Sequence, residues 1–169
     1  MHKKYGMLLL LVCAGCSVFS RQVVVRSQED FLAMQQTFIT SLDGAMARFA
    51  RNVGEVENQK RVCVDAVTAQ VNALLAVPAE ERTFENTAKA LDNAMRVLAE
   101  VGETFNFITM LYEDATMRDA ATKALNDLKA LGEELIEGNK KVYLALREYL
   151  DNSYKTEQLD AAEQYFLDE

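Results

Sequence analysis

The stretch FENTAKALDNAMRVLAEVGETFNFITML, residues 84–111, decides the fold class of this chain. Its apolar side chains recur every three or four residues without a gap, which is the period of one face of an α-helix. They are Phe84, Ala88, Leu91, Met95, Leu98, Val101, Phe105, Ile108 and Leu111. Thr83 is a suitable N-cap, and Glu85 places negative charge in the first turn, beside exposed N–H groups. The pattern predicts a long amphipathic helix that begins at Thr83.

The same period extends upstream, from Ser27 to Pro78, where the helical pattern ends. Gly44 and Gly54 lie inside this run and are places where it can divide into two helices, since each glycine costs about 1 kcal/mol relative to alanine. The apolar positions are Phe38, Leu42, Ala45, Phe49, Val53, Val56, Cys63, Val67, Val71 and Leu74. Their spacing is roughly 3.6 rather than 3.5 residues, which favours globular packing over a coiled coil.

Downstream, Thr116 is predicted to open a third helix, with Asp119 completing a capping pair. Gly132 and Gly138 are predicted bends in this helix. Its apolar positions are Ala120, Leu125, Leu128, Leu131, Leu135, Val142, Leu146 and Leu150.

Asn152 to Lys155 are predicted to form a turn, after which Thr156 starts a fourth helix that continues through Leu159, Ala162 and Phe166. Long helices joined by short polar turns favour antiparallel neighbours that each bury one face. We therefore expect an all-α fold of long antiparallel amphipathic helices in an up-and-down bundle.

The composition is that of a globular domain, because half of the 169 residues are hydrophobic and the chain has one Pro and seven Gly. The formal net charge is -8 and becomes about -10 if a leader carrying Lys3 and Lys4 is removed. Such a surface repels phosphate backbones, so we expect no nucleic-acid partner.

Residues 1–15 are predicted to be a signal peptide, with Lys3 and Lys4 at its charged start and an apolar run from Met7 to Val12. It is too short to span a bilayer. The phrase LVCAGC, residues 11–16, resembles a bacterial lipoprotein signal, in which Cys16 would receive lipid and become the mature N-terminus. Cys13 is unsuited to that role because bulky residues precede it. An uncleaved or generic secretory leader is the alternative.

This signal predicts a protein of the bacterial cell envelope, anchored in the membrane through lipid at Cys16 and facing the periplasm or the cell exterior. Residues 16–26 would form a tether, and residues 27–169 the helical domain. Only Cys63 then remains as a free thiol, so no intramolecular disulfide can form. Its neighbours Val62, Val64 and Val67 predict a small buried residue rather than a reactive one.

Part of the chain resembles the helical N-terminal region of a zinc oligopeptidase family that includes thimet oligopeptidase, oligopeptidase A and mitochondrial intermediate peptidase. The resemblance covers roughly residues 78–169. It consists of AEER at 79–82 followed by FENT at 84–87, MRDA at 117–120, NKKVYLAL at 139–146 and LDAAE at 159–163. Convergence of amphipathic helices is the alternative account of these phrases, and Phe84, Tyr143 and the leucines are expected in the core under either one.

In complete members of that family, zinc is held by two histidines of an HExxH helix and by a later glutamate. This chain has one histidine, His2, and no HExxH. We therefore expect no catalytic residue, metal ligand or cofactor here, with zinc entering only through a separate catalytic half. Glu80-Glu81 and Glu133-Glu134 are expected to be solvated charges.

Two functions remain open at this stage. The resemblance implies a lipid-anchored, non-catalytic fragment of an oligopeptidase-like enzyme, truncated or split, which contributes a wall of the substrate channel. The alternative is a stand-alone helical lipoprotein of the periplasm or cell surface that binds a partner or a peptide.

Overall fold

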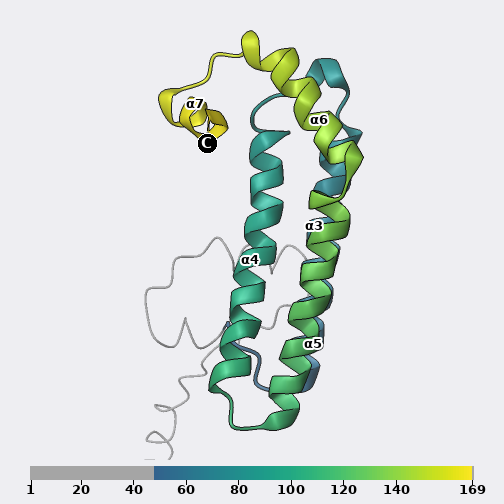
Figure 1. Cartoon of the computed structure of the whole chain (residues 1–169), viewed down its shortest axis with the longest axis vertical. Coiled ribbons are helices and arrows are strands. Elements are labelled where there is room, and N and C mark those ends of the chain that lie inside the picture. Colours follow the sequence, from purple (N-terminus) through teal and green to yellow (C-terminus); the bar gives the residue numbers. More distant parts are fainter. Residues whose placement is uncertain (1–47, 169) are drawn as a thin grey trace, which may run out of the picture.

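The computed structural model describes residues 48–168, and all regular elements in this part of the chain are helical (Figure 1). Four α-helices of different lengths follow α3. Short 3-10 helices (η1 and η3) and one π-helical turn (η2) lie between them. In order, the elements are α3 (Val53–Ala76), η1 (Ala79–Glu81), α4 (Ala88–Leu111), α5 (Ala115–Gly132), η2 (Glu133–Glu137), α6 (Lys140–Asp151), η3 (Ser153–Lys155) and α7 (Ala161–Asp168). The all-α prediction is confirmed.

Helices α3, α4 and α5 pack side by side along most of their lengths, and each contacts both of the others. The chain ascends in α3, descends in α4 and ascends again in α5, whose direction α6 continues (Figure 1). Helix α7 then lies outside the bundle, near the N-terminal end of α4 (Figure 1). This arrangement confirms the up-and-down helical bundle.

The core lies between the apolar faces of α3, α4 and α5. Its fully enclosed members include Val67 of α3, Phe105 and Ile108 of α4, and Ala121 of α5. Two residues that the sequence places on the core face of α4 are exposed instead, because Met95 is 49% and Leu111 71% exposed. Met95 lines a groove, and Leu111 is the last residue of its helix.

The bounds of α3 agree with the predicted break in the upstream run. The helix begins at Val53, with Asn52 as N-cap, and ends at Ala76, two residues before Pro78. Oδ1 of Asn52 accepts the N–H of Glu55 at 3.0 Å, and Oε1 of Glu55 accepts from Nδ2 of Asn52 at 2.9 Å. Helix α3 therefore starts just before Gly54, one of the two predicted points of division, while the preceding part of the run up to residue 47, with Gly44, lies outside the described residues.

Helix α5 begins at Ala115, one residue before the predicted Thr116, but its cap is a different side chain from the predicted pair. Helix α5 is capped by Asp114, whose Oδ1 accepts from the N–H and the hydroxyl of Thr116 at 2.8 and 2.7 Å. The hydrogen bond from the Thr116 hydroxyl is the main reason why the pKa of Asp114 is lowered. Asp119 consequently takes no part in the cap.

Helix α7 starts at Ala161 rather than at Thr156, whose hydroxyl instead donates to the carbonyl of Ser153 at 3.0 Å. Asp160 and Glu163 form a reciprocal capping pair. Oδ1 of Asp160 accepts the N–H of Glu163 at 2.9 Å, and Oε2 of Glu163 accepts the N–H of Asp160 at 2.8 Å. The phrase LDAAE thus contains the start of α7, five residues after the predicted start at Thr156.

Of the two predicted bends, only the one at Gly138 is confirmed. Gly132 has ordinary helical angles, and the chain passes from α5 directly into η2, a π-helical turn of five residues. This turn closes where the N–H of Gly138 donates to the carbonyl of Glu133 at 2.7 Å, and Asn139 then caps α6. A Cβ atom on Gly138 would lie only 2.9 Å from that carbonyl oxygen, so the turn requires glycine.

Substituting Gly138→Ala should lower the free energy of unfolding by about 1–3 kcal/mol, because the new methyl group overpacks against backbone. The measurement is urea denaturation followed by circular dichroism. Gly132→Ala is the matched control, since its Cβ would meet Leu98 Cδ1 at an ordinary 3.6 Å. That control should be neutral or stabilise by up to about 1 kcal/mol. Equal stability of the two variants would contradict this account of Gly138.

Candidate functional site

An open groove runs along the seam between α4 and the continuous segment formed by α5 and η2. Its volume is about 330 Å³, within the range of sites that hold small ligands or side chains. Leu98 of α4, Leu125 and Leu128 of α5 and Ile136 of η2 provide apolar side chains to its lining. Leu128 and Ile136 belong to the buried core, and the partly buried Leu98 and Leu125 pack against it, so the floor of the groove is continuous with the core.

Two glycines leave the space that the groove occupies. A Cβ atom on Gly102 would lie 3.5 Å from Leu125 Cδ1, and one on Gly132 would lie 3.6 Å from Leu98 Cδ1. Both distances are ordinary van der Waals contacts, so an alanine would fit at either position and would fill part of the groove. Met95 and Ala99 form the outer edge on α4, and Met95 is half exposed.

The charged side chains around the groove are mostly acidic. Glu103 of α4 and Glu133 and Glu137 of η2 contribute carboxylates, against the single ammonium group of Lys129 among the lining residues. All of these residues are exposed. An apolar floor with a predominantly negative rim suits an apolar surface that carries positive charge at its edges.

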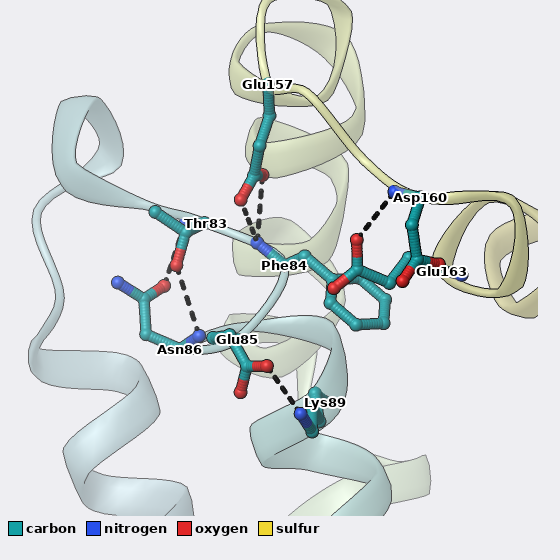
Figure 2. Close-up of polar contacts among 8 residues, drawn as sticks. All are labelled: Thr83, Phe84, Glu85, Asn86, Lys89, Glu157, Asp160 and Glu163. Carbon is teal, nitrogen blue, oxygen red and sulfur yellow. Dashed lines mark hydrogen bonds and ion pairs between the residues drawn. The ribbon is translucent and has the colours of Figure 1, made fainter.

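The FENT phrase has a structural role directly before the N-terminal end of α4. There Asn86 organises the turn that precedes the helix (Figure 2). Its Oδ1 accepts the N–H of Thr83 and the hydroxyl of Thr87, both at 2.8 Å, and its Nδ2 donates to the carbonyl of Glu81 at 2.9 Å. These bonds hold residues 83–87 as a turn. Helix α4 therefore begins at Ala88 rather than at the predicted Thr83.

Glu157 links this turn to the C-terminal part of the chain, and we call the contact the Glu157 clamp. Both carboxylate oxygens accept the N–H of Phe84, at 3.0 and 3.2 Å, and Oε2 also accepts the hydroxyl of Tyr149 at 3.0 Å. Figure 2 shows Glu157 reaching down to the backbone of Phe84. The Phe84 ring packs edge-on against Phe166 of α7 at 5.5 Å, so α7 is held to the start of α4.

Tyr149 is fully buried, and sequence analysis did not identify it. Burial raises its pKa above the ordinary 10.0, and the neighbouring Glu157 carboxylate adds to that shift. The hydroxyl therefore stays protonated and can donate to Glu157. Helical periodicity does not predict this contact, because Glu157 accepts from the N–H of Phe84, which lies 73 residues earlier in the chain, as well as from the Tyr149 hydroxyl.

Other acidic residues of the FENT region are solvated, as expected. Glu85 forms an exposed ion pair with Lys89, one turn along the helix, and Glu80 and Glu81 are exposed in η1. Such surface pairs contribute little to stability, because water screens both charges.

Arg82, in the same region, is buried. It donates to the carbonyl of Leu74 at 3.2 Å and lies 3.4 Å from a Glu148 oxygen. It fastens the end of α3 to α6.

The predicted site residues have different outcomes. Cys16, Cys13 and His2 lie outside the described residues. Cys63 is fully buried, which raises its pKa to about 12 and confirms the unreactive, buried thiol. Phe84 is in the core, but Tyr143 is 57% exposed, so its predicted core position is wrong. Val142 and Ala145 form the buried face of α6, and Tyr143 points away from it.

Within residues 48–168, no group of three or more His, Cys, Asp or Glu side chains is placed so that it could hold a metal ion. None of the helices in this part combines the length and the apolar content needed to cross a bilayer. No protein-family model, curated protein or solved structure matches this chain. The resemblance to the zinc oligopeptidases therefore stays a prediction.

Replacing Tyr149 by Phe keeps the ring and removes only the hydroxyl that donates to Glu157. The free energy of unfolding should fall by about 1.5–3 kcal/mol, the range for a hydrogen bond to a charged group. Because the pKa of Tyr149 is raised on folding, its contribution is complete below pH 10.0 and is lost as pH rises further. The variant should therefore lose less stability than wild type above pH 10.0.

Urea denaturation at pH 7, repeated at increasing alkaline pH, measures both effects. Tyr165→Phe is the control, since Tyr165 is 66% exposed on α7. The Glu157 clamp would be refuted as a stabilising contact if both variants matched wild type at pH 7.

Proposed function

We propose that this chain is a lipid-anchored helical module of the bacterial cell envelope that acts by binding a partner. The observation that carries the proposal is the groove between α4 and α5–η2, with its apolar lining and its predominantly acidic rim. A helical bundle that presents such a groove can receive one face of an amphipathic helix. The proposed partner is therefore an amphipathic helix or peptide with an apolar stripe flanked by Lys or Arg.

Charge supports this choice of partner. The chain carries a formal net charge of -8, and Glu103, Glu133 and Glu137 concentrate part of it at the groove. Opposite charges on the two surfaces increase the rate of encounter and exclude acidic peptides. The partly buried Leu98 and Leu125 and the buried Leu128 would supply the apolar contact that holds the partner.

The anchor is proposed from the sequence alone. Lipid on Cys16 would hold the protein at a membrane, and residues 16–26 would separate the bundle from it. An extended segment of that length spans at most roughly 35–40 Å. The groove would then be displayed close to the membrane, where partner proteins of the envelope are concentrated.

A fluorescently labelled 18-residue peptide of Leu and Lys, with its leucines on one helical face, tests the groove. It should bind the full chain, as measured by fluorescence anisotropy at low ionic strength. The double variant Glu133→Lys/Glu137→Lys should weaken binding at least tenfold, because it reverses the charge of the rim. Glu134→Lys is the matched control, since Glu134 is exposed in the same turn but does not line the groove.

The control should change the affinity less than twofold, and a Leu and Glu peptide of the same pattern should not bind. Equal binding of the basic and acidic peptides, or equal weakening by the control, would rule out the groove as the site. Filling the groove with Gly102→Ala/Gly132→Ala tests the apolar contribution, and should weaken binding without loss of stability.

The lipid anchor has its own test. Cys16→Ser should abolish labelling by radioactive fatty acid in the producing bacterium and should move the protein from the membrane fraction to the soluble fraction. Cys13→Ser should leave both unchanged. If labelling persists in Cys16→Ser and is lost in Cys13→Ser, the lipid is attached to Cys13 and our assignment to Cys16 is wrong.

The second candidate function is the non-catalytic fragment of an oligopeptidase-like enzyme. One observation favours it, namely the exposed apolar side chains on α6 and α7, where further helices of a larger protein could pack. They are Tyr143, Leu144, Leu150, Tyr165 and Phe166. A separately supplied catalytic half should bind this face and gain zinc-dependent peptidase activity. Absence of a complex at micromolar concentrations would exclude this candidate.

A further inference from the structure

The charged side chains of the groove follow an uneven order along its length. Helices α4 and α5 run antiparallel (Figure 1), so the start of one lies beside the end of the other. A Cβ atom on Gly102 of α4 would meet Leu125 of α5, and one on Gly132 would meet Leu98. These two neighbour pairs show which lining residues of the two helices share each end of the groove.

We call the two ends the Glu103 end and the η2 end. Glu103 is the charged residue of the first end, and Lys129 of α5 lies between the two ends. Glu133 and Glu137 lie at the η2 end, where Met95 forms the edge on α4. From the Glu103 end to the η2 end, the groove therefore presents one carboxylate, one ammonium group and then two carboxylates.

None of these four charged side chains forms a hydrogen bond or an ion pair with another residue between 48 and 168. All four are exposed. The bundle does pair such groups elsewhere, since Lys60 of α3 binds both Glu57 and Asp127, the latter on α5. The charges along the groove are therefore available to a partner.

We propose that this order of charges fixes the direction in which the groove holds a helix, an inference that rests on the proposed function. The bound helix places its more basic half, with Lys or Arg side chains, at the η2 end beside Glu133 and Glu137. Its other half carries an uncharged or acidic side chain opposite Lys129. In the reverse direction the basic half would meet Lys129, which repels it, and Glu103 alone would attract it.

The separation of these charges is suited to such discrimination. Lys129 and Glu137 are eight residues apart, which corresponds to roughly 10–12 Å along the helix axis. This distance is close to the Debye length of about 10 Å at 0.1 M salt, so a bound helix meets the two regions as distinct charges at low ionic strength. The preference for one direction should weaken as salt is added.

Disulfide trapping of a peptide measures this direction in the full chain. In a Cys13→Ser/Cys16→Ser background, Met95→Cys places a thiol at the η2 end, and Thr122→Cys places one at the Glu103 end, two turns before Lys129 on the same face of α5. The peptide has 18 residues, leucines on one helical face, Lys in its N-terminal half and Gln in its C-terminal half. An activated mixed disulfide at its N-terminus should react with Met95→Cys about fivefold or more faster than with Thr122→Cys.

Moving the activated group to the C-terminus of the same peptide should reverse the preference, which separates direction from the intrinsic reactivity of the two thiols. Cys63 is buried and should react with neither peptide. In 1 M salt, where the Debye length is about 3 Å, both preferences should approach unity.

The decisive variant is Lys129→Glu/Glu133→Gln/Glu137→Gln, which keeps the formal net charge of the chain and moves the negative charge to the Glu103 end. It should reverse the direction of trapping. Glu134→Gln is the matched control, since Glu134 does not line the groove, and should leave the direction unchanged. The direction of trapping is compared between each variant and wild type with both forms of the peptide.

The failures of the two proposals are distinguishable. If the peptide binds in fluorescence anisotropy but is trapped equally at both ends, or if the triple variant traps it in the original direction, the directional inference is overturned and the groove remains a binding site. If the peptide does not bind the full chain, both the directional inference and the proposed function are overturned.

Discussion

Mutual burial of one apolar face on each of α3, α4 and α5 is the interaction on which the rest of this structure depends. Small residues on the facing sides, among them Ala66, Ala94, Ala121 and Ala124, are almost completely buried. They let the helices approach closely, while larger neighbours such as Phe105 fill the spaces between them. Each helix would be marginally stable alone, so its length and position follow from this packing.

The groove and the core are produced by the same seam. Leu98, Leu125 and Leu128 pack inward against the bundle and also line the groove between α4 and α5. Gly102 and Gly132 keep that seam open at the surface, although alanine would fit at both positions. A chain selected for stability alone would favour alanine there, since glycine weakens a helix interior. This cost is one reason to connect the groove with a function.

Polar contacts between distant segments determine how the C-terminal part is held. The Glu157 clamp uses a carboxylate, a buried tyrosine hydroxyl and a backbone N–H from α4's leading turn. Buried polar groups of this kind are costly without partners, so the clamp forms only where all of them meet. The FENT phrase, on which the oligopeptidase resemblance partly rests, therefore also has a local structural explanation in this chain.

Periodicity in the sequence was sufficient to predict the helical class, the up-and-down order, the end at Pro78 and the buried thiol of Cys63, because one buried face imposes a period near 3.6 residues. Periodicity did not predict that Met95 and Tyr143 are exposed. The width of a buried face depends on how many neighbours a helix has, which the sequence pattern does not give. Caps were misplaced at Thr83, Thr116 and Thr156 because several polar residues near each start compete, and local geometry selects among them. The sequence by itself determined the helical class and the approximate course of the long helices. Only the tertiary structure decided which faces those helices share, where the seam stays open and how Glu157 meets Phe84, because these depend on contacts between residues far apart in the chain.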